Sequence, residues 1–371
     1  MTLDTITLAN FKNIAEATLD FSPKVNCLLG DNGMGKSNLL DAIYFLSFTK
    51  SYSRMTDAML IRRGEEFGMV KGIYTRGDDR EEIVAGLRPA VRKTFRRGGK
   101  EYKRLSMHIG LFPAVMVAPA DLGIVQGDSV ERRRFMDSII SQSDPVYLDA
   151  LLRYGQCLEQ RNRLLRDGSD DPALYESLEM MMDVAAGTLR HGRHRFVARL
   201  KGLFADYYTR LAGEDSENVS IELSESGSGE ESLARSLEHN RQRDRILKHT
   251  SVGPHRDDLL FTIDDMPLKR AGSQGQSKTF TVALRLAQYR FLRDISPVRP
   301  LLLLDDIFDK LDAGRVERIV RMVAGDEFGQ IFITDTNRKH LDEIVDAAGG
   351  DFRMWEVRDG SFTLTASHEA N

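Results

Sequence analysis

A glycine-rich segment that ends in a lysine and a serine is the strongest chemical signal in the sequence. Glycine lets backbone N–H groups turn inward around an anion without Cβ clashes. Four residues separate Gly30 from Gly35-Lys36-Ser37, and this spacing predicts a phosphate-binding loop. The loop consists of Gly30, Asp31, Asn32, Gly33, Met34, Gly35, Lys36 and Ser37. We expect ATP there, with Lys36 on the β- and γ-phosphates and the Ser37 hydroxyl on Mg²⁺.

The residues around this loop have the pattern that it requires. Residues 25–29 are mostly apolar and predict a short strand, and apolar residues recur at helical spacing after Ser37. The sequence therefore predicts a strand, the loop and a helix whose N-terminus faces the phosphates. A chance glycine turn is the alternative, and it would not require these flanking elements.

Two adjacent carboxylates follow an apolar run in the last quarter of the chain. Residues 301–304 are four leucines and predict a buried strand, and Asp305 and Asp306 stand at its end. In nucleotide-binding sheets the first such acid lies beside the magnesium ion, and the second orients or deprotonates a water. We expect Asp305 to bind Mg²⁺, and Asp306 to act with Lys36 in catalysis. A strand followed by an acidic cap is the alternative.

A third segment narrows the class of ATP-binding protein. Ser273, Gln274, Gly275 and Gln276 open a predicted helix that precedes the two acids. Such a helix start can bind an anion, yet one nucleotide does not need two γ-phosphate sites in one chain. We therefore expect this segment to contact the ATP of a second subunit. The alternative is a serine-capped helix start without such a role.

The predicted elements suggest an α/β fold with an inserted, mostly helical lobe. Residues 1–128 are expected to form the first part of an ATPase lobe, with a β-rich stretch over 68–104. Residues 129–245 predict the helical lobe, including a long helical pattern over 172–212 with possible breaks at Gly187 and Gly192. Residues 246–371 are expected to complete the ATPase lobe.

Composition limits the location of the protein and the kind of surface that it can offer. The net charge is −4, so a DNA-binding surface would have to be a local basic patch. The two cysteines are not clustered, which favours a reducing cytoplasm over a disulfide framework. Neither a signal region nor an apolar run of ~20 residues is evident. We expect a soluble, cytoplasmic protein without a membrane partner.

Two groups of basic residues are candidates for contacts with the DNA backbone. One lies within 88–104 and the other within 190–201. The candidates are Arg92, Lys93, Arg96, Arg97, Lys100, Arg193, Arg195 and Arg199. Charge runs are usually solvated faces, and this alternative stays open. We find no stacking motif with interleaved aromatics, which favours contact with phosphates over reading of bases.

Several segments together resemble the RecF family of bacterial recombination mediators. They are LANFKNIAEATLDFS (8–22), GDNGMGKSNLLDAIYFLS (30–47), APADLGIVQGDSVERRRFMDSII (118–140), SVGPHRDDL (251–259), SQGQSKT (273–279) and LLLLDDIFD (301–309). The resemblance covers nearly the whole chain. The order of phosphate loop, Ser-x-Gly-Gln and acidic strand is that of an ABC-type ATPase head, and Asp309 and Asp312 stand where that class has its D-loop.

The resemblance implies an ABC-type head and an ATP-dependent homodimer, in which each signature segment completes the partner's ATP site. It implies slow, weak ATP hydrolysis and DNA binding, with a preference for junctions of single and double strands. It also implies work with RecO and RecR in loading recombinase at gaps, within the response to DNA damage. In SMC-like heads the corner after the first strand lies near the nucleotide, so Lys12 and Asn13 are candidate contacts with ATP. The alternative, that they form a plain surface turn, stays equally open.

Two departures from the class and two alternatives remain. The second acid is Asp306 where transporter ATPases carry glutamate, and Thr334-Asp335-Thr336 stands in place of the usual switch histidine. The identity of the γ-phosphate sensor therefore stays open. The chain could instead be the ATPase subunit of a membrane transporter, or a DNA-associated scaffold that hardly hydrolyses ATP. For His255, holding a turn is favoured over contact with nucleotide.

Overall fold

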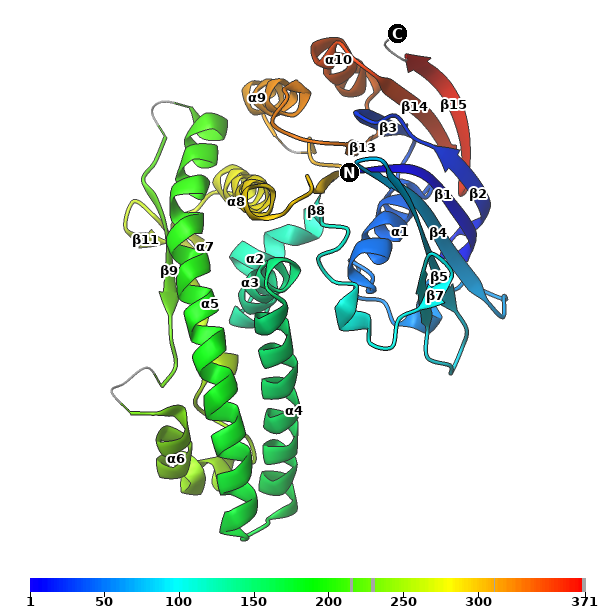
Figure 1. Cartoon of the computed structure of the whole chain (residues 1–371). Helices are drawn as coiled ribbons and strands as arrows, with labels where there is room; N and C mark the ends of the chain where they lie inside the picture. The colour runs from blue at the N-terminus through cyan, green and yellow to red at the C-terminus, as the bar shows by residue number, and fades with distance from the viewer. Residues whose placement is uncertain (214–215, 228–230, 310, 369–371) are drawn as a thin grey trace. The chain divides into compact units, whose positions relative to one another are not determined.

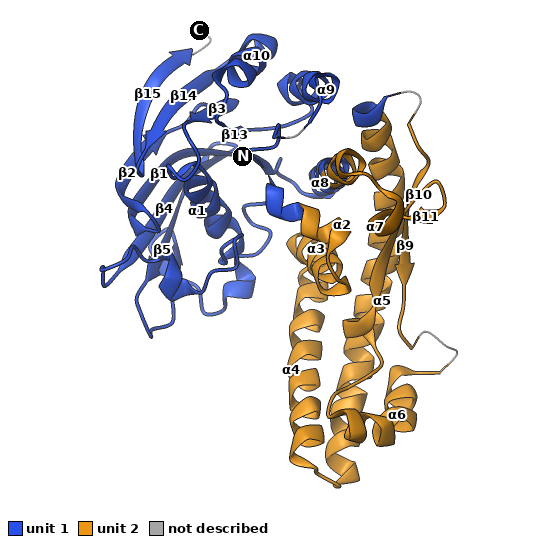
Figure 2. Cartoon of the chain, turned by 180° about the vertical axis from the view of Figure 1, so that it is seen from behind, with its two compact units in different colours: residues 1–121, 210–213, 282–371 blue, residues 122–209, 214–281 orange. Residues whose placement is uncertain are grey.

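The structure is a computed structural model that describes residues 1–213, 216–227, 231–309 and 311–368. The chain forms two compact units (Figure 2). Unit 1 comprises residues 1–121, 210–213 and 282–371, and unit 2 comprises residues 122–209 and 214–281. Unit 2 extends beyond the helical lobe predicted for 129–245 at both ends. It includes Ser273 to Gln276, which the sequence assigned to the ATPase lobe.

Unit 1 is built on two six-stranded sheets. The first is antiparallel, in the order β2-β1-β4-β5-β6-β7. Its strands are β1 (Thr2–Phe11), β2 (Ile14–Asp20), β4 (Gly68–Arg76), β5 (Asp79–Leu87), β6 (Thr94–Arg97) and β7 (Lys100–Glu101). The alternation of buried and partly buried residues along β4 shows that one face of this sheet packs against the core.

The second sheet has the order β15-β14-β3-β13-β12-β8 and is parallel except for the β14–β15 pair. Its strands are β3 (Val25–Leu29), β8 (Ala114–Val117), β12 (Leu301–Asp305), β13 (Ile331–Asp335), β14 (Phe352–Arg358) and β15 (Ser361–His368). The central strands β12 and β13 are buried along their whole length. This explains why they appear in the sequence as continuous apolar runs.

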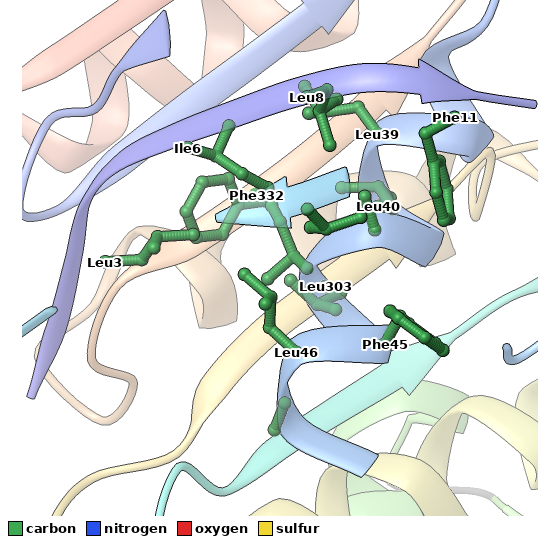
Figure 3. Packing of buried hydrophobic residues seen from close by; sticks show 14 of the residues in the cluster. Leu3, Ile6, Leu8, Phe11, Leu39, Leu40, Phe45, Leu46, Leu303 and Phe332 are labelled. Carbon is green, nitrogen blue, oxygen red and sulfur yellow. The ribbon is translucent and has the colours of Figure 1, made fainter. Parts of the chain in front are cut away.

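Helix α1 (Lys36–Phe48) lies between the two sheets and contacts strands of both (Figure 1). Its apolar residues and those of β1, β12 and β13 share one core, which Figure 3 shows from close by. The side chains labelled there are Leu3, Ile6, Leu8, Phe11, Leu39, Leu40, Phe45, Leu46, Leu303 and Phe332. Because α1 begins at the phosphate loop, this core fixes the position of the loop relative to the second sheet.

Helix α10 (Arg338–Ala348) contacts β3 and β13 of the second sheet, and α9 (Ala313–Ala324) packs against α10. Unit 2 contains α2 (Leu122–Gln126), α3 (Ser129–Ser143), α4 (Pro145–Asp167), α6 (Leu233–Leu247) and α7 (Leu268–Ala271). Its antiparallel sheet has the order β11-β10-β9, with β9 (Val219–Ser224), β10 (Asp258–Ile263) and β11 (Met266–Pro267). Helices α5 (Pro172–Ala212) and α8 (Gln274–Ile295) each begin in unit 2 and end in unit 1.

The structure confirms the predicted strands before the phosphate loop and before the two acids, and the helix that begins at the segment of Ser273 to Gln276. The predicted breaks in the long helix are wrong. Helix α5 runs without interruption for 41 residues, about 60 Å at the usual rise per residue. Two isolated glycines lower helix stability by only ~1 kcal/mol each, which the buried face of the helix offsets.

Candidate nucleotide-binding site

The phosphate loop joins β3 to α1, as the sequence predicted. A Cβ built on Gly30 would lie 2.4 Å from the carbonyl oxygen of Val357, so no larger residue fits there. Gly35 has a φ of 115°, a conformation that side chains other than glycine's rarely adopt. These two positions explain why the loop needs glycine where the chain leaves β3 and where α1 begins.

The Lys36 side chain is 3% exposed and lies within its own loop. Its ammonium donates to the carbonyl oxygens of Gly30 at 2.6 Å and Asp31 at 3.1 Å. The Asp306 carboxylate is 4.0 Å away. A triphosphate in the loop would offer this ammonium stronger, charged acceptors.

A compact oxygen cluster lies at the carboxyl ends of the central strands. Register aligns Asp305 of β12 with Thr334 of β13, and Thr334 with Leu28 of β3. The Ser37 hydroxyl donates to Asp305 Oδ1 at 2.8 Å, and the Thr334 hydroxyl donates to the same atom at 2.9 Å. Burial raises the pKa of Asp305. Serine and aspartate oxygens are ligands that Mg²⁺ accepts, so this cluster could hold the ion.

Asp306 has a φ of 42°, which is uncommon for a residue other than glycine. Its backbone N–H donates to the Thr334 hydroxyl at 3.0 Å, and this bond helps to hold the conformation. The Asp306 side chain is 27% exposed, so a water molecule can reach it. Strained positions of this kind persist where the surrounding structure fixes them, and they gather at functional sites.

We expect Asp305→Asn to stabilise the metal-free protein and to weaken Mg²⁺-dependent nucleotide binding. The amide oxygen can still accept from Ser37, but it carries no charge for the ion. Because folding raises the pKa of Asp305, the ionised carboxylate opposes folding above its unfolded pKa. The gain in melting temperature should therefore be present at neutral pH and vanish at pH values below the unfolded pKa, where both states are protonated.

Thermal unfolding in EDTA, and again with Mg²⁺ and ATP, measures both effects. Ligand at 100 times its Kd stabilises the wild type by about 2.7 kcal/mol, and the variant should gain much less. Equal stabilisation of both proteins by Mg²⁺ and ATP would contradict the role of Asp305.

The turn after β1 contributes two neighbours of the loop. Asn13 Nδ2 donates to the Met34 carbonyl oxygen at 3.3 Å, and Asn38 Nδ2 donates to Asn13 Oδ1 at 2.7 Å. Lys12 forms a buried ion pair with Asp41 of α1. The structure therefore places Asn13 against the loop, while the Lys12 ammonium is engaged by a carboxylate that the sequence analysis missed. A contact of either residue with nucleotide stays a prediction.

A cavity of about 610 Å³ borders this corner. It is lined by Lys12, Asn13, Asn38, Met55, Met59, Ile61, Arg62 and Arg63. The methionines and isoleucine offer apolar contact, and the arginines and asparagines offer donors. Residues 55–63 carry no motif that would have predicted this role, and only the fold brings them beside Asn13.

The signature segment, Ser273 to Gln276, lies in unit 2 at the beginning of α8. The Ser273 hydroxyl accepts from the Gln276 N–H at 3.2 Å, and the Gln276 side chain accepts from the Ser273 N–H at 2.7 Å. This reciprocal pair is a capping box. Ser273 and Gln274 are exposed. The serine cap that the sequence left as an alternative is thus present, and contact with a second subunit stays a prediction.

The two D-loop acids differ in their surroundings. Asp309 is exposed. Asp312 caps α9, accepting from the Arg315 N–H at 2.9 Å, and this bond lowers the pKa of its carboxyl group. A structural role of Asp312 is therefore visible, whereas a role of either acid toward another subunit stays a prediction.

The segment that replaces the switch histidine contains a hydrogen-bonded pair. Asp335 Oδ2 lies 2.7 Å from His340 Nδ1 at the start of α10. His340 stands five residues beyond Asp335, and no motif in the sequence predicted that the two would pair. Thr334 is buried, and its hydroxyl lies 2.9 Å from Asp305 Oδ1 and 3.5 Å from Asp306 Oδ1. It is therefore positioned to respond when either of these carboxylates changes its contacts.

Arg193 must be removed from the candidate DNA contacts. It is 2% exposed, and its guanidinium pairs with Asp137 at 3.0 Å and Asp257 at 2.7 Å inside unit 2. His255 also has a structural place there, because its ring lies 2.8 Å from the Tyr154 hydroxyl and 3.0 Å from the Thr250 carbonyl oxygen. Burial lowers the pKa of His255 to about 4, so its imidazole is neutral at neutral pH.

The remaining basic candidates fall into two groups. Lys93, Arg97 and Arg195 each pair with a carboxylate, of Asp57, Glu81 and Asp144 respectively. Arg92, Arg96, Lys100 and Arg199 have exposed side chains. Among the described residues, Arg92, Arg96 and Lys100 can meet a phosphate without giving up an existing contact, whereas Arg199 has a contact of its own. Within the described part of the chain, no helix has the length and apolar character needed to cross a bilayer.

Comparisons with known proteins agree on one family. Residues 2–353 match the profile described as "RecF/RecN/SMC N terminal domain". The chain is 48% identical over 365 residues to the "DNA replication and repair protein RecF" of Bacteroides fragilis, covering 97% of this chain and 98% of that protein. It is 47% identical over 366 residues to the protein of the same name from Phocaeicola vulgatus, covering 98% of each.

Solved structures show the same fold. A structure described as "the recombination mediator protein RecF-ATPrS in RecFOR pathway" matches with a TM-score of 0.87 and 27% identity, over 98% of each chain. An SMC head domain from Pyrococcus furiosus matches with a TM-score of 0.57 at 18% identity, which shows the ABC-type ATPase fold alone. From the family profile and the near full-length identity to RecF proteins, we conclude that this chain belongs to the RecF family of DNA replication and repair proteins.

Proposed function

We propose that this chain is a cytoplasmic, ATP-dependent DNA-binding protein of recombinational DNA repair. Its ATP would lie in the loop of residues 30–37, with Lys36 on the β- and γ-phosphates. Mg²⁺ would take Ser37 and Asp305 as ligands, displacing the hydrogen bond that now joins them. The observation that carries the proposal is this cluster of Ser37, Asp305 and Thr334 at the end of the phosphate loop, in a chain of the RecF family.

The cavity beside Asn13 is our candidate for the nucleoside. It borders the phosphate loop through Asn13, which bonds to the Met34 carbonyl oxygen. Met55 and Met59 are 40% and 61% exposed, so they offer apolar surface that a base could cover. Sites for such ligands combine apolar walls with a few polar groups, and this cavity has both.

We further propose that ATP holds two copies of the chain together. Ser273 to Gln276 of one copy would contact the ATP of the other, and Asp309 and Asp312 would lie near the same junction. An exposed Ser273 at the N-terminus of a 22-residue helix has free surface and a favourable dipole for a phosphate. Hydrolysis by a water beside Asp306 would then open the dimer slowly.

Membership of the RecF family supports the partners that we propose. We propose that the closed dimer binds DNA at single-strand/double-strand junctions and works with RecO and RecR to load recombinase at gaps during the response to DNA damage. Arg92, Arg96 and Lys100 are exposed and have no ion pair within the described part of the chain, which makes them our first candidates for phosphate contacts. Arg195 and Arg199 are exposed but already have contacts. Membership of the RecF family speaks against a transporter subunit. A scaffold that hardly hydrolyses ATP is kept as a rival, and single-turnover hydrolysis separates it from an active enzyme.

Binding of labelled DNA with and without ATP, across a range of salt, tests the proposal. ATP should strengthen binding by the wild type, and salt should weaken it because phosphate contacts release counterions. Lys36→Met should abolish the ATP effect. If ATP leaves DNA binding by the wild type unchanged, the control of DNA binding by ATP, which we call gating, is overturned. If the wild type binds no DNA at all, the proposed function is overturned.

A further inference from the structure

A second cavity, of about 280 Å³, lies in unit 1 away from the phosphate loop. It is formed by β6, β7 and the segments that flank them, and Arg92, Lys93, Phe95, Glu101, Tyr102 and Lys103 line it. Phe95 and Tyr102 are seven residues apart, so they form no stacking motif in the sequence. The hairpin brings them together, with the Tyr102 N–H donating to the Phe95 carbonyl oxygen at 2.9 Å.

The aromatic side chains give the cavity an apolar wall. Phe95 is 1% exposed and belongs to the core of unit 1. Tyr102 is half-buried, and its hydroxyl lies 3.2 Å from His108 Nδ1. Its ring meets the His108 ring edge-to-face, with the centroids 5.2 Å apart. Tyr102 is thus held from one side by buried groups, while part of its surface faces the cavity.

The charged side chains at the cavity are unequal. Lys93 pairs with Asp57 at 2.8 Å and lies over the Phe45 ring, so its charge is already compensated. Arg92, Glu101 and Lys103 are exposed. Among the residues that the structure describes, none of these three side chains has a hydrogen-bond or ion-pair partner. Two uncompensated cations and one carboxylate therefore surround an aromatic wall.

We propose that this cavity takes one unstacked base of a single-stranded DNA segment against Tyr102, with the flanking phosphates on Arg92 and Lys103. The proposal rests on the DNA binding proposed above and adds a site for the single strand. An aromatic surface beside cations is the common means of binding single strands, since every base has a face that stacks. Within a duplex both faces of a base are covered by its stacked neighbours, so only an unstacked base can lie against Tyr102.

Glu101 makes the proposal testable by a gain of affinity. Its carboxylate opposes an approaching phosphate, so Glu101→Gln should strengthen binding of oligothymidylate about threefold. Unfolding cannot produce such a gain. Glu16→Gln is the matched control, because Glu16 is an exposed carboxylate on β2 of the same sheet and lies outside the cavity. It should leave the affinity unchanged.

Tyr102 tests the base contact. With ATP present, the anisotropy of labelled oligothymidylate, an abasic strand of equal length and a blunt duplex would be measured with the full chain. Tyr102→Leu should weaken the binding of oligothymidylate about tenfold, because only a base can stack. It should leave the binding of the abasic strand and of the duplex unchanged. Tyr102→Phe keeps the ring and should bind oligothymidylate within twofold of the wild type.

The outcomes separate this site from the proposed function. Equal loss on all three probes, or no loss on any, would overturn the base site while ATP-dependent duplex binding remained. A gain of affinity with Glu16→Gln equal to that with Glu101→Gln would mean that net charge alone acts, and would also overturn it. A wild type that binds none of the probes would overturn the DNA-binding function and this site together.

Discussion

Lys36→Met is expected to weaken ATP binding by at least roughly 100-fold and to abolish the effect of ATP on DNA binding. The Lys36 ammonium is 3% exposed and already donates to two carbonyl oxygens within its loop. Charge-assisted hydrogen bonds contribute about 1.5–3 kcal/mol each, and two of them to phosphates correspond to at least that factor. Methionine has a similar length but neither charge nor donor, so it fills the space and removes the contacts.

Equilibrium binding of a fluorescent ATP analogue checks the first part, and anisotropy of labelled DNA checks the second. Lys24→Met is a suitable control, because it removes a lysine from the same unit whose partner, Asp326, is 99% exposed. The control should bind ATP as the wild type does. Wild-type ATP affinity in Lys36→Met would contradict the phosphate-loop assignment. Weak ATP binding with unchanged ATP-dependent DNA binding would contradict the gating instead.

Ser273→Arg is expected to weaken ATP-driven dimerisation by roughly 100-fold and to leave ATP affinity within twofold of the wild type. Ser273 is not one of the residues of the loop 30–37, so the substitution leaves the side chains of the loop unchanged. The long arginine side chain would have to fit where the small Ser273 meets the partner's ATP, and overpacking of this kind costs about 1–3 kcal/mol, the upper end of which gives a factor of this size. Light scattering against protein concentration, with and without ATP, measures it.

The capping role of Ser273 calls for a control with the same structural cost. Ser232 caps α6 in the same unit, its hydroxyl accepting from the Arg235 N–H at 3.4 Å. Ser232→Arg therefore loses a comparable cap, about 1 kcal/mol, and adds the same charge. It should dimerise with ATP like the wild type. Normal ATP-driven dimerisation by Ser273→Arg, or an equal defect in Ser232→Arg, would contradict the role of the signature segment.

The cluster that would hold magnesium shows how local and distant information combine. The types of Ser37 and Asp305 and the strand or helix next to each could be predicted, because each depends on a few neighbouring residues. Their contact spans 268 positions and depends on the parallel register of β3, β13 and β12. Thr334, on the strand between them, was noted only as a departure, since nothing local indicates that its hydroxyl would join the two acids.

The basic residues show the reverse case, in which local pattern misleads. Arg193 and Arg195 are two positions apart in one helix, and the sequence treats them alike. On a helix of 3.6 residues per turn they face different directions. Arg193 is buried between Asp137 and Asp257, whereas the Arg195 side chain is 65% exposed. Whether a charged side chain lies on the surface or in an internal ion pair depends on which face of its helix packs against the rest of the protein. That face is decided by residues far along the chain.

By itself, the sequence determined the phosphate loop, the acidic strand end, the capped helix start at Ser273 and the order of these segments. Those features follow from backbone freedom, hydrophobic periodicity and side-chain chemistry within a few residues. Only the tertiary structure decided that Lys12 pairs with Asp41, that residues 55–63 and Asn13 share a cavity, and that Tyr102 meets Arg92 and Lys103 at another. Such contacts arise because strand register and packing bring distant positions together, which no local pattern encodes.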